Sequence, residues 1–184
     1  MQIFRKTVES ANAVGLSLPD CPLPSTDVKA VARLLDLCPV ARPTPLVEAE
    51  DLAKKLGVAE IWVKDERSRM GLGSFKALGA AYVIAVDAAD SGADLTDSPL
   101  SGVTYVTASA GNHGMSVAAG ARVFGAGAVI YIAESVPESF ARRLREKGAE
   151  VVRAGQIYEE SMAAAAKARR TNSCSDVVCP DAIK

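Results

Sequence analysis

Short apolar runs alternate with longer amphipathic stretches over the second half of the chain. The runs predict strands at 103–107, 128–132, 150–152 and 177–178. Helices are expected between them: one ending near Phe124, one from the capping box Ser135–Glu138 to Gly148, and one over 157–170. Strands that alternate with helices indicate βαβ units with right-handed crossovers. We therefore predict an α/β fold, an open parallel sheet with flanking helices.

The pattern before residue 75 is less regular. Three closely spaced prolines make residues 1–24 an irregular arm rather than a core element. The periodicity then predicts a helix over 28–35 that is capped by Ser25 or Thr26, a helix over 47–56 and a strand over 61–64. Between the two helices, Arg42-Pro43-Thr44-Pro45-Leu46 forms a stiff turn, because each proline restricts its own backbone and that of the residue before it.

A lysine lies in the glycine-rich stretch Gly71-Leu72-Gly73-Ser74-Phe75-Lys76-Ala77-Leu78-Gly79. Apolar residues at helical spacing follow it and predict a helix over 75–88 that buries Phe75, Leu78, Tyr82, Ala85 and Val86. With Ser74 as N-cap, Lys76 lies in the first turn, where the helix dipole disfavours a cation by about 0.3–1 kcal/mol. An imine with an aldehyde cofactor would remove this conflict. The alternative is a lysine whose amine reaches solvent from a helix start.

A second polar group, Thr107-Ala108-Ser109-Ala110-Gly111-Asn112-His113-Gly114, joins a strand end to a helix start. Ligands gather beyond the carboxyl ends of strands in open α/β sheets, and a helix start suits a carboxylate or phosphate. Asn112 offers a neutral donor that suits a phenolate oxygen. His113 fits either a proton shuttle or a structural histidine whose hydrogen bonds are satisfied.

Composition narrows the function classes. The chain has 184 residues, of which 49% are hydrophobic and 23% charged, and a net charge of −1. This balance is typical of a globular protein and gives no electrostatic footprint for nucleic acid or a membrane surface. The N-terminus lacks the apolar core of a signal peptide, and no apolar run is long enough to span a bilayer, so we expect a cytoplasmic protein.

Metal chemistry is not expected either. With one histidine, a zinc site built on several histidines is excluded. The four cysteines fall at no recognised metal spacing and are expected to be free thiols: Cys21, Cys38, Cys174 and Cys179. Two charge-rich runs, Asp65–Arg69 and Arg142–Lys147, are most simply interpreted as solvated surface.

Taken together, the motifs resemble those of the pyridoxal-phosphate enzymes of the tryptophan synthase β-subunit fold (fold type II). The resemblance runs from about residue 40 to the end, and its two central motifs are Ser74-Phe75-Lys76 and Ser109-Ala110-Gly111-Asn112-His113-Gly114. Arg42–Leu46 and Trp62–Leu72 add to it. Within this group the chain is most similar to diaminopropionate ammonia-lyase, and next to threonine and serine dehydratases.

The resemblance implies a cofactor, a reaction and site residues. It implies pyridoxal 5'-phosphate, Lys76 as the Schiff-base lysine, and Asn112 as the partner of the pyridine hydroxyl. The implied cradle for the substrate carboxylate is the backbone of Ser109, Ala110, Gly111, Asn112 and His113. The implied reaction is α,β-elimination from a small amino acid, which gives a 2-oxo acid and ammonia.

The chain departs from the family pattern in two ways. Diaminopropionate lyases typically have an aspartate that serves as a base where this chain has Ala110. The glycine-rich phosphate loop of the family, the partner of the pyridine nitrogen and most of the larger domain normally come after the region covered here, and Gly125-Ala126-Gly127 is better interpreted as a turn.

The resemblance also implies how the chain divides into domains. Residues 1–74 would form an arm and the start of the larger domain, and 75–184 the smaller α/β domain. Two alternatives stay open, a non-catalytic module and half of a split enzyme. The expected partners are accordingly a second copy, in a homo-oligomer, or a complementing C-terminal chain, and residues 1–184 alone are not expected to turn over substrate.

Overall fold

A computed structural model describes residues 27–171. The predictions for the arm at 1–24 and for a strand at 177–178 lie outside this range, as do Cys21, Cys174 and Cys179. The elements are α1 (Val28–Asp36), β1 (Leu46–Glu48), α2 (Glu50–Leu56), β2 (Trp62–Lys64), the 3-10 turns η2 (Glu66–Gly71) and η3 (Phe75–Leu78), α3 (Ala80–Asp90), β3 (Thr104–Ala108), α4 (Asn112–Val123), β4 (Gly127–Ile132), α5 (Glu138–Glu146), β5 (Glu150–Arg153) and α6 (Tyr158–Thr171).

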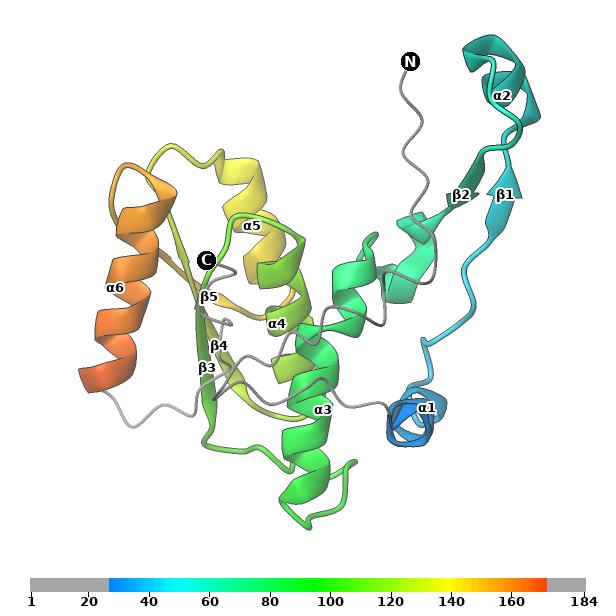
Figure 1. Cartoon of the computed structure of the whole chain (residues 1–184). Helices are drawn as coiled ribbons and strands as arrows, with labels where there is room; N and C mark the ends of the chain where they lie inside the picture. The colour runs from blue at the N-terminus through cyan, green and yellow to red at the C-terminus, as the bar shows by residue number, and fades with distance from the viewer. Residues whose placement is uncertain (1–26, 172–184) are drawn as a thin grey trace, which may run out of the picture.

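The core is a parallel sheet with the order β3-β4-β5, which confirms the predicted α/β fold. Figure 1 shows α6 on one side of the sheet and α3 and α4 on the other, while α5 packs against β5 and α4. The apolar runs form this sheet because both of its faces are covered, and the largest buried side chains on it include Tyr105, Ile130 and Ile132. All three strands point the same way, so their carboxyl ends meet at one edge.

Helices α3 and α4 approach each other closely through small residues. A β-carbon built on Gly120 would lie 3.0 Å from Cα of Ala81, so only glycine fits there without a shift. The buried Ser116 accepts a hydrogen bond from the backbone N–H of Ala81 at 3.2 Å. The start of α3 is thereby fixed against α4, and this contact sets the distance between the two predicted site segments.

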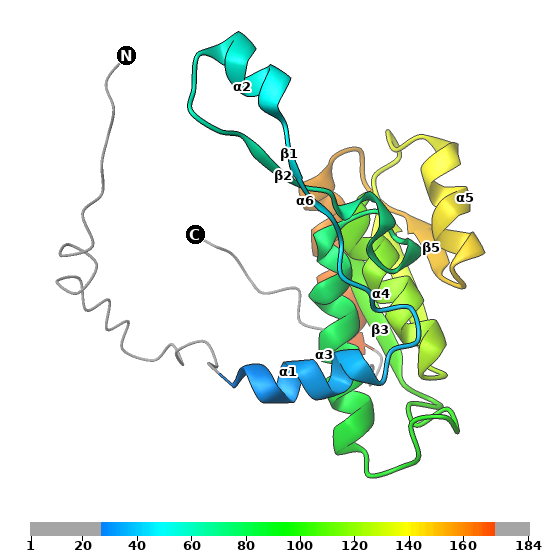
Figure 2. The same cartoon turned by 90° about the vertical axis from the view of Figure 1, so that its right-hand side faces the viewer.

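The segment from β1 to β2, residues 46–64, projects from this body (Figures 1 and 2) and is called the arm below. Strands β1 and β2 pair antiparallel around α2, and Figures 1 and 2 show the three elements extending beyond the sheet and its helices. Seven apolar side chains of the arm are exposed: Leu46, Val47, Leu52, Leu56, Val58, Trp62 and Val63. Burial of apolar area is the main force that stabilises folds. The described residues leave this apolar surface of the arm exposed, so it is available to a covering polypeptide.

Three details of the predicted helices are wrong. The helix expected over 47–56 begins only at Glu50, because Leu46–Glu48 pairs with β2. Helix 75–88 is interrupted at Gly79, where the backbone (φ −91°, ψ −83°) separates η3 from α3. The buried face of this segment consists of Ala77, Ala80, Ile84 and Ala88, whereas Phe75 and Leu78 are exposed.

Two predicted helix caps also differ. Asp27 caps α1 by accepting from the N–H groups of Lys29 and Ala30, so neither Ser25 nor Thr26 is required. At α5 the N-cap is Pro137, which has no side-chain acceptor. The expected capping box does not form there, because Ser135 donates to the carbonyl of Gln156 and the Glu138 carboxylate binds arginines instead.

The charged run at 65–69 is only partly solvated, contrary to the prediction. Arg67 is exposed, but the side chains of Glu66 and Arg69 are 16% and 12% exposed and bind each other. No helix of residues 27–171 is long and apolar enough to cross a membrane.

Candidate active site

Lys76 lies in η3, at a turn that Ser74 caps as predicted. The backbone N–H of Lys76 donates to Oγ of the buried Ser74 at 3.2 Å, and the N–H of Ala77 donates to the Ser74 carbonyl. The Lys76 side chain is exposed, and its amine makes no hydrogen bond or ion pair with any residue in the described part of the chain. A fixed backbone therefore presents an uncommitted primary amine.

Ser109 organises the loop between β3 and α4. Its N–H donates to the Tyr131 carbonyl, which extends the pairing of β3 with β4 by one residue. Its Oγ accepts from the N–H groups of Gly111 at 3.2 Å and Gly114 at 3.1 Å. The Ser109 side chain therefore shapes the loop, and its oxygen is already committed to the backbone.

The two glycines of this loop have different roles. A β-carbon on Gly114 would lie 2.8 Å from the Ser109 carbonyl and 3.3 Å from Ile130, so the loop itself requires glycine there. At Gly111 the nearest atom to an added carbon is Ser109 Oγ at 3.9 Å. The space over Gly111 is therefore available to a ligand, while the space over Gly114 is filled by protein.

The start of α4 leaves donors available. Gly111 is the N-cap, and no side chain caps the helix. Within residues 27–171, nothing accepts from the backbone N–H groups of Asn112 and His113, which lie between the two donors that Ser109 binds. Free N–H groups and the helix dipole together attract an anion. The geometry suits the predicted carboxylate cradle.

Lys76 and the loop come together because η3 packs against α4. The positive charge of Lys76 is close enough to His113 to help lower the pKa of that imidazole. Asn112, the neighbouring residue, has an exposed side chain that bonds to no described residue. The predicted lysine and the predicted loop thus belong to one region.

His113 is held as a neutral imidazole. Burial is the main cause that lowers its pKa from the ordinary value of 6.5, and the charge of Lys76 is the second. Its Nε2 is buried and has no hydrogen-bond partner among the described residues, so a proton on this atom would also lack an acceptor. The hydrogen-bonded structural histidine of the sequence analysis is not observed at this nitrogen.

A pH titration should show this directly. His113 is the chain's one histidine, so a single imidazole resonance reports on it, and it should titrate below about 6.5. Between the two pKa values the unfolded state binds a proton on His113 that the folded state does not bind. The free energy of unfolding should therefore fall as the pH drops from about 6.5 through the pKa of the folded state. His113→Gln should lose this part of the acid-side slope. A folded pKa at or above 6.5 would contradict the assignment.

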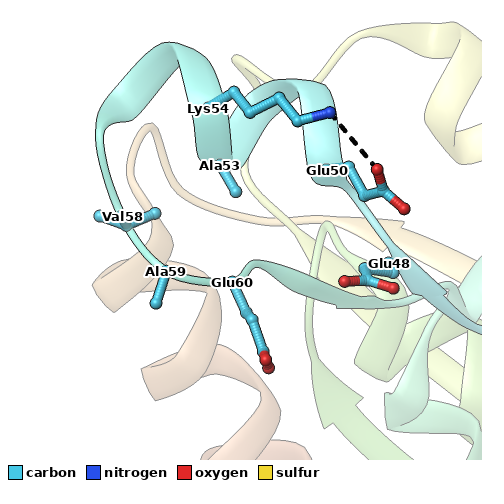
Figure 3. Close-up of a pocket in the computed structure, with 7 residues that line it drawn as sticks. All are labelled: Glu48, Glu50, Ala53, Lys54, Val58, Ala59 and Glu60. Atoms are coloured by element: carbon cyan, nitrogen blue, oxygen red, sulfur yellow. Dashed lines mark hydrogen bonds and ion pairs between the residues drawn. The ribbon is translucent and has the colours of Figure 1, made fainter.

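Two surface hollows lie away from this region. The one in Figure 3 has a volume of about 230 Å³ and lies on the arm between α2 and β2. It is lined by Glu48, Glu50, Ala53, Lys54, Val58, Ala59 and Glu60. Its carboxylates do not form a metal site, since no trio of potential metal ligands occurs in residues 27–171. The second, of about 340 Å³, lies beside α1 and Arg69.

One side chain at the carboxyl edge of the sheet was not singled out from the sequence. The hydroxyl of Tyr158, at the start of α6, lies 3.4 Å from the Ala108 carbonyl at the end of β3. Its distance of 50 residues from Ala108 along the chain leaves no local signal for this contact. The parallel order of β3, β4 and β5 brings it there.

Comparison with protein families identifies the family of the chain. The model of the family described as "Pyridoxal-phosphate dependent enzyme" matches residues 37–180. The chain belongs to this family. The match covers both the Lys76 turn and the loop before α4, so this member of the family has its two predicted site segments inside the family region.

Curated relatives are elimination enzymes. Diaminopropionate ammonia-lyase of Escherichia coli K12 is 35% identical over 130 residues, which cover 66% of this chain and 33% of that protein. L-threonine ammonia-lyase of Geobacter sulfurreducens is 34% identical over 130 residues, 70% of this chain and 29% of that protein. The chain thus spans about a third of the length of these relatives.

Solved structures agree with the fold. The E. coli diaminopropionate ammonia lyase in complex with D-serine superposes with a TM-score of 0.75 at 30% identity, over 82% of this chain and 41% of that one. Threonine deaminase isoform 2 of Solanum lycopersicum has a TM-score of 0.63 at 24% identity, over 86% of this chain and 44% of that one. The second similarity supports the fold alone.

The described residues fit one side of pyridoxal phosphate. The uncommitted amine of Lys76 suits its aldehyde, and the exposed amide of Asn112 suits its ring hydroxyl. The turn at Gly125 does not suit its phosphate, because a β-carbon there would lie 2.5 Å from that of Ser98, so this turn packs against protein. The fit is therefore to the reactive end of the cofactor.

Proposed function

We propose that this protein takes part in a pyridoxal-phosphate-dependent α,β-elimination on a small amino acid, as a diaminopropionate ammonia-lyase does. The observation that supports this best is the pairing of an uncommitted lysine amine in η3 with free N–H groups at the start of the adjacent α4. A nucleophilic amine and an anion site side by side suit an α-amino acid, which has a carboxylate next to its reacting carbon.

Lys76, Asn112 and the start of α4 would have different roles in this reaction. Lys76 would hold the cofactor covalently and, once displaced by substrate, accept the Cα proton at Nζ. The cofactor, when bound, serves as an electron sink for the charge left on Cα. Asn112 would donate from its amide to the ring hydroxyl. The N–H groups of Asn112 and His113 would bind the substrate carboxylate, which orients the Cα–H bond toward the lysine.

The neutral state of His113 supports this arrangement. A charged imidazole beside Lys76 would place a second cation next to the amine. Because burial keeps the imidazole uncharged, the amine faces no second cation in the first turn of α4. His113 would therefore act through Lys76, while its backbone N–H touches the substrate.

The direct test is a substrate panel. Supplied with pyridoxal phosphate and a complementing C-terminal chain, the purified protein should release ammonia and pyruvate from diaminopropionate faster than from serine, and faster than it releases ammonia and 2-oxobutanoate from threonine. Preference for threonine would favour the dehydratase alternative. Release from none of the three by the complemented protein would contradict the elimination proposal.

The exposed arm supports the alternative that the chain is completed by another polypeptide. Exposed apolar residues gather on β1, α2 and β2, in the part assigned to the larger domain, while the 75–171 body has a well-buried core. A complementing polypeptide or second copy that covers the arm would fit a split enzyme or a homo-oligomer. The domain boundary at residue 74, these partners and the cytoplasmic location remain predictions from the sequence.

A further inference from the structure

We infer that Thr44, Glu66 and Arg69, together the Arg69 cluster, are positioning residues that fix the loop in which Lys76 lies. The inference rests on the role proposed for Lys76. None of the three touches Lys76. They act on the backbone between residues 69 and 76, which runs from the end of η2 into η3.

The cluster is a closed set of short hydrogen bonds. Arg69 donates from Nε to Glu66 Oε2 at 2.6 Å and from Nη2 to Glu66 Oε1 at 2.8 Å. The Thr44 hydroxyl donates to Glu66 Oε1 at 2.5 Å and accepts from Arg69 Nη2 at 2.9 Å. The pKa of Glu66 is lowered to about 2, chiefly by the bond from Arg69, so the carboxylate stays ionised.

The cluster joins segments that are far apart in sequence. Arg69 Nη1 reaches the Arg42 carbonyl at 3.0 Å, and Lys64 Nζ reaches the Thr44 carbonyl at 2.5 Å. Thr44 is 6% exposed. A two-pronged arginine contact that is shielded from water has a defined geometry, unlike an exposed ion pair. The 42–44 segment therefore anchors η2.

The backbone after Arg69 requires such an anchor. Met70 has φ 48° and ψ 26°, a left-handed conformation that is unfavourable for a residue with a side chain. Gly71 and Gly73 follow with φ 66° and 72°. Conformations of this kind persist where surrounding contacts over-determine them. The N–H of Leu72 bonds to the Arg69 carbonyl at 2.8 Å, so a shift of Arg69 moves the loop.

A matched pair of arginines gives the test. Arg67 also binds an acid in the same segment, Asp65, through its guanidinium, but it is 91% exposed. Arg69→Met and Arg67→Met remove the same charge two residues apart. If only the Arg69 cluster positions the loop, only Arg69→Met should alter it.

The first measurement is hydrogen exchange, which needs no cofactor. In Arg69→Met the amides of Leu72, Lys76 and Ala77 should exchange about tenfold faster, while the amides of β4 keep their rates. The second is the rate at which pyridoxal phosphate and borohydride label Lys76, which should fall about tenfold relative to labelling of the exposed Lys54. Arg67→Met should match the wild type in both.

Two threonine variants cover the case in which Arg69→Met does not fold. Thr44→Val keeps the volume but loses the hydroxyl, and it should shift both measurements about threefold in the same direction. Thr44→Ser restores the hydroxyl and should return both toward the wild type. Equal behaviour of Thr44→Val and Thr44→Ser would overturn the inference.

The outcomes separate the two proposals. Normal labelling of Lys76 with unchanged loop exchange in Arg69→Met overturns the positioning role and leaves the proposed function intact. A wild-type protein that takes no label at Lys76 overturns the proposed function, and with it the inference, whatever the exchange rates show. Faster exchange throughout β4 as well would show a general loss of stability and overturn a role confined to the loop.

Discussion

Replacing Lys76 by alanine is expected to abolish the attachment of pyridoxal phosphate that survives dilution, and to lower ammonia release by the complemented protein by at least about 10³-fold. The reason is that no other side chain of the site has an amine: the loop before α4 contains Ser109, Ala110, Asn112 and His113. The measurement is borohydride reduction followed by mass mapping of the modified lysine, together with the cofactor absorption band after dilution.

The control for this variant is another exposed lysine. Lys54 lies on α2 of the arm and pairs with Glu50 at 3.4 Å. Lys54→Ala should keep both the label on Lys76 and the activity. An absorption band that survives unchanged in Lys76→Ala would assign the attachment to a different lysine and would refute the site described above.

The second large effect concerns stereochemistry and follows from Ala110. This residue is half-buried beside the core, and its side chain has no atom that can accept a proton, so a face of Cα turned toward it would lack a base. General base catalysis contributes about 10²–10⁴-fold, so elimination from D-diaminopropionate should be slower than from the L-enantiomer by about 10²-fold. Pyruvate release from the two enantiomers measures this ratio.

Two variants at position 110 isolate the base. Ala110→Asp should raise the rate with the D-enantiomer, and Ala110→Asn, which has nearly the same shape but no basic carboxylate, should not. Equal rates for the two enantiomers in the wild type would contradict the prediction, because a base for the second face would then have to come from elsewhere.

The parallel sheet was predictable because its signal is local. Each of β3, β4 and β5 is a short apolar run, and a strand covered on both faces requires this. Strand β1 was missed for the opposite reason. Its residues Leu46–Glu48 fit a helical pattern, and they become a strand only by pairing with β2, whose partner for Leu46 is Lys64.

In the candidate site, too, the local features were predictable from the sequence and the long-range contacts were not. Ser74, Lys76 and the loop at 109–113 are contiguous motifs, so residue type and spacing were enough to select them. The charged run Asp65–Arg69 was interpreted as solvated surface, because nothing near Glu66 in sequence shows that Thr44, 22 residues earlier, will cover it. Long-range contacts of charged residues leave no periodic pattern in a single sequence.

The projecting arm has a spectroscopic consequence. The chain's one tryptophan, Trp62, lies on β2 with 52% of its surface exposed and its indole N–H bonded to Glu60 at 3.0 Å. Indole emission moves to shorter wavelength when water is removed from the ring, so intrinsic fluorescence here senses the arm and not the core around Ile130. A polypeptide that covered the arm would shift this emission even if the sheet did not change, and no dye or tag would be needed to detect it.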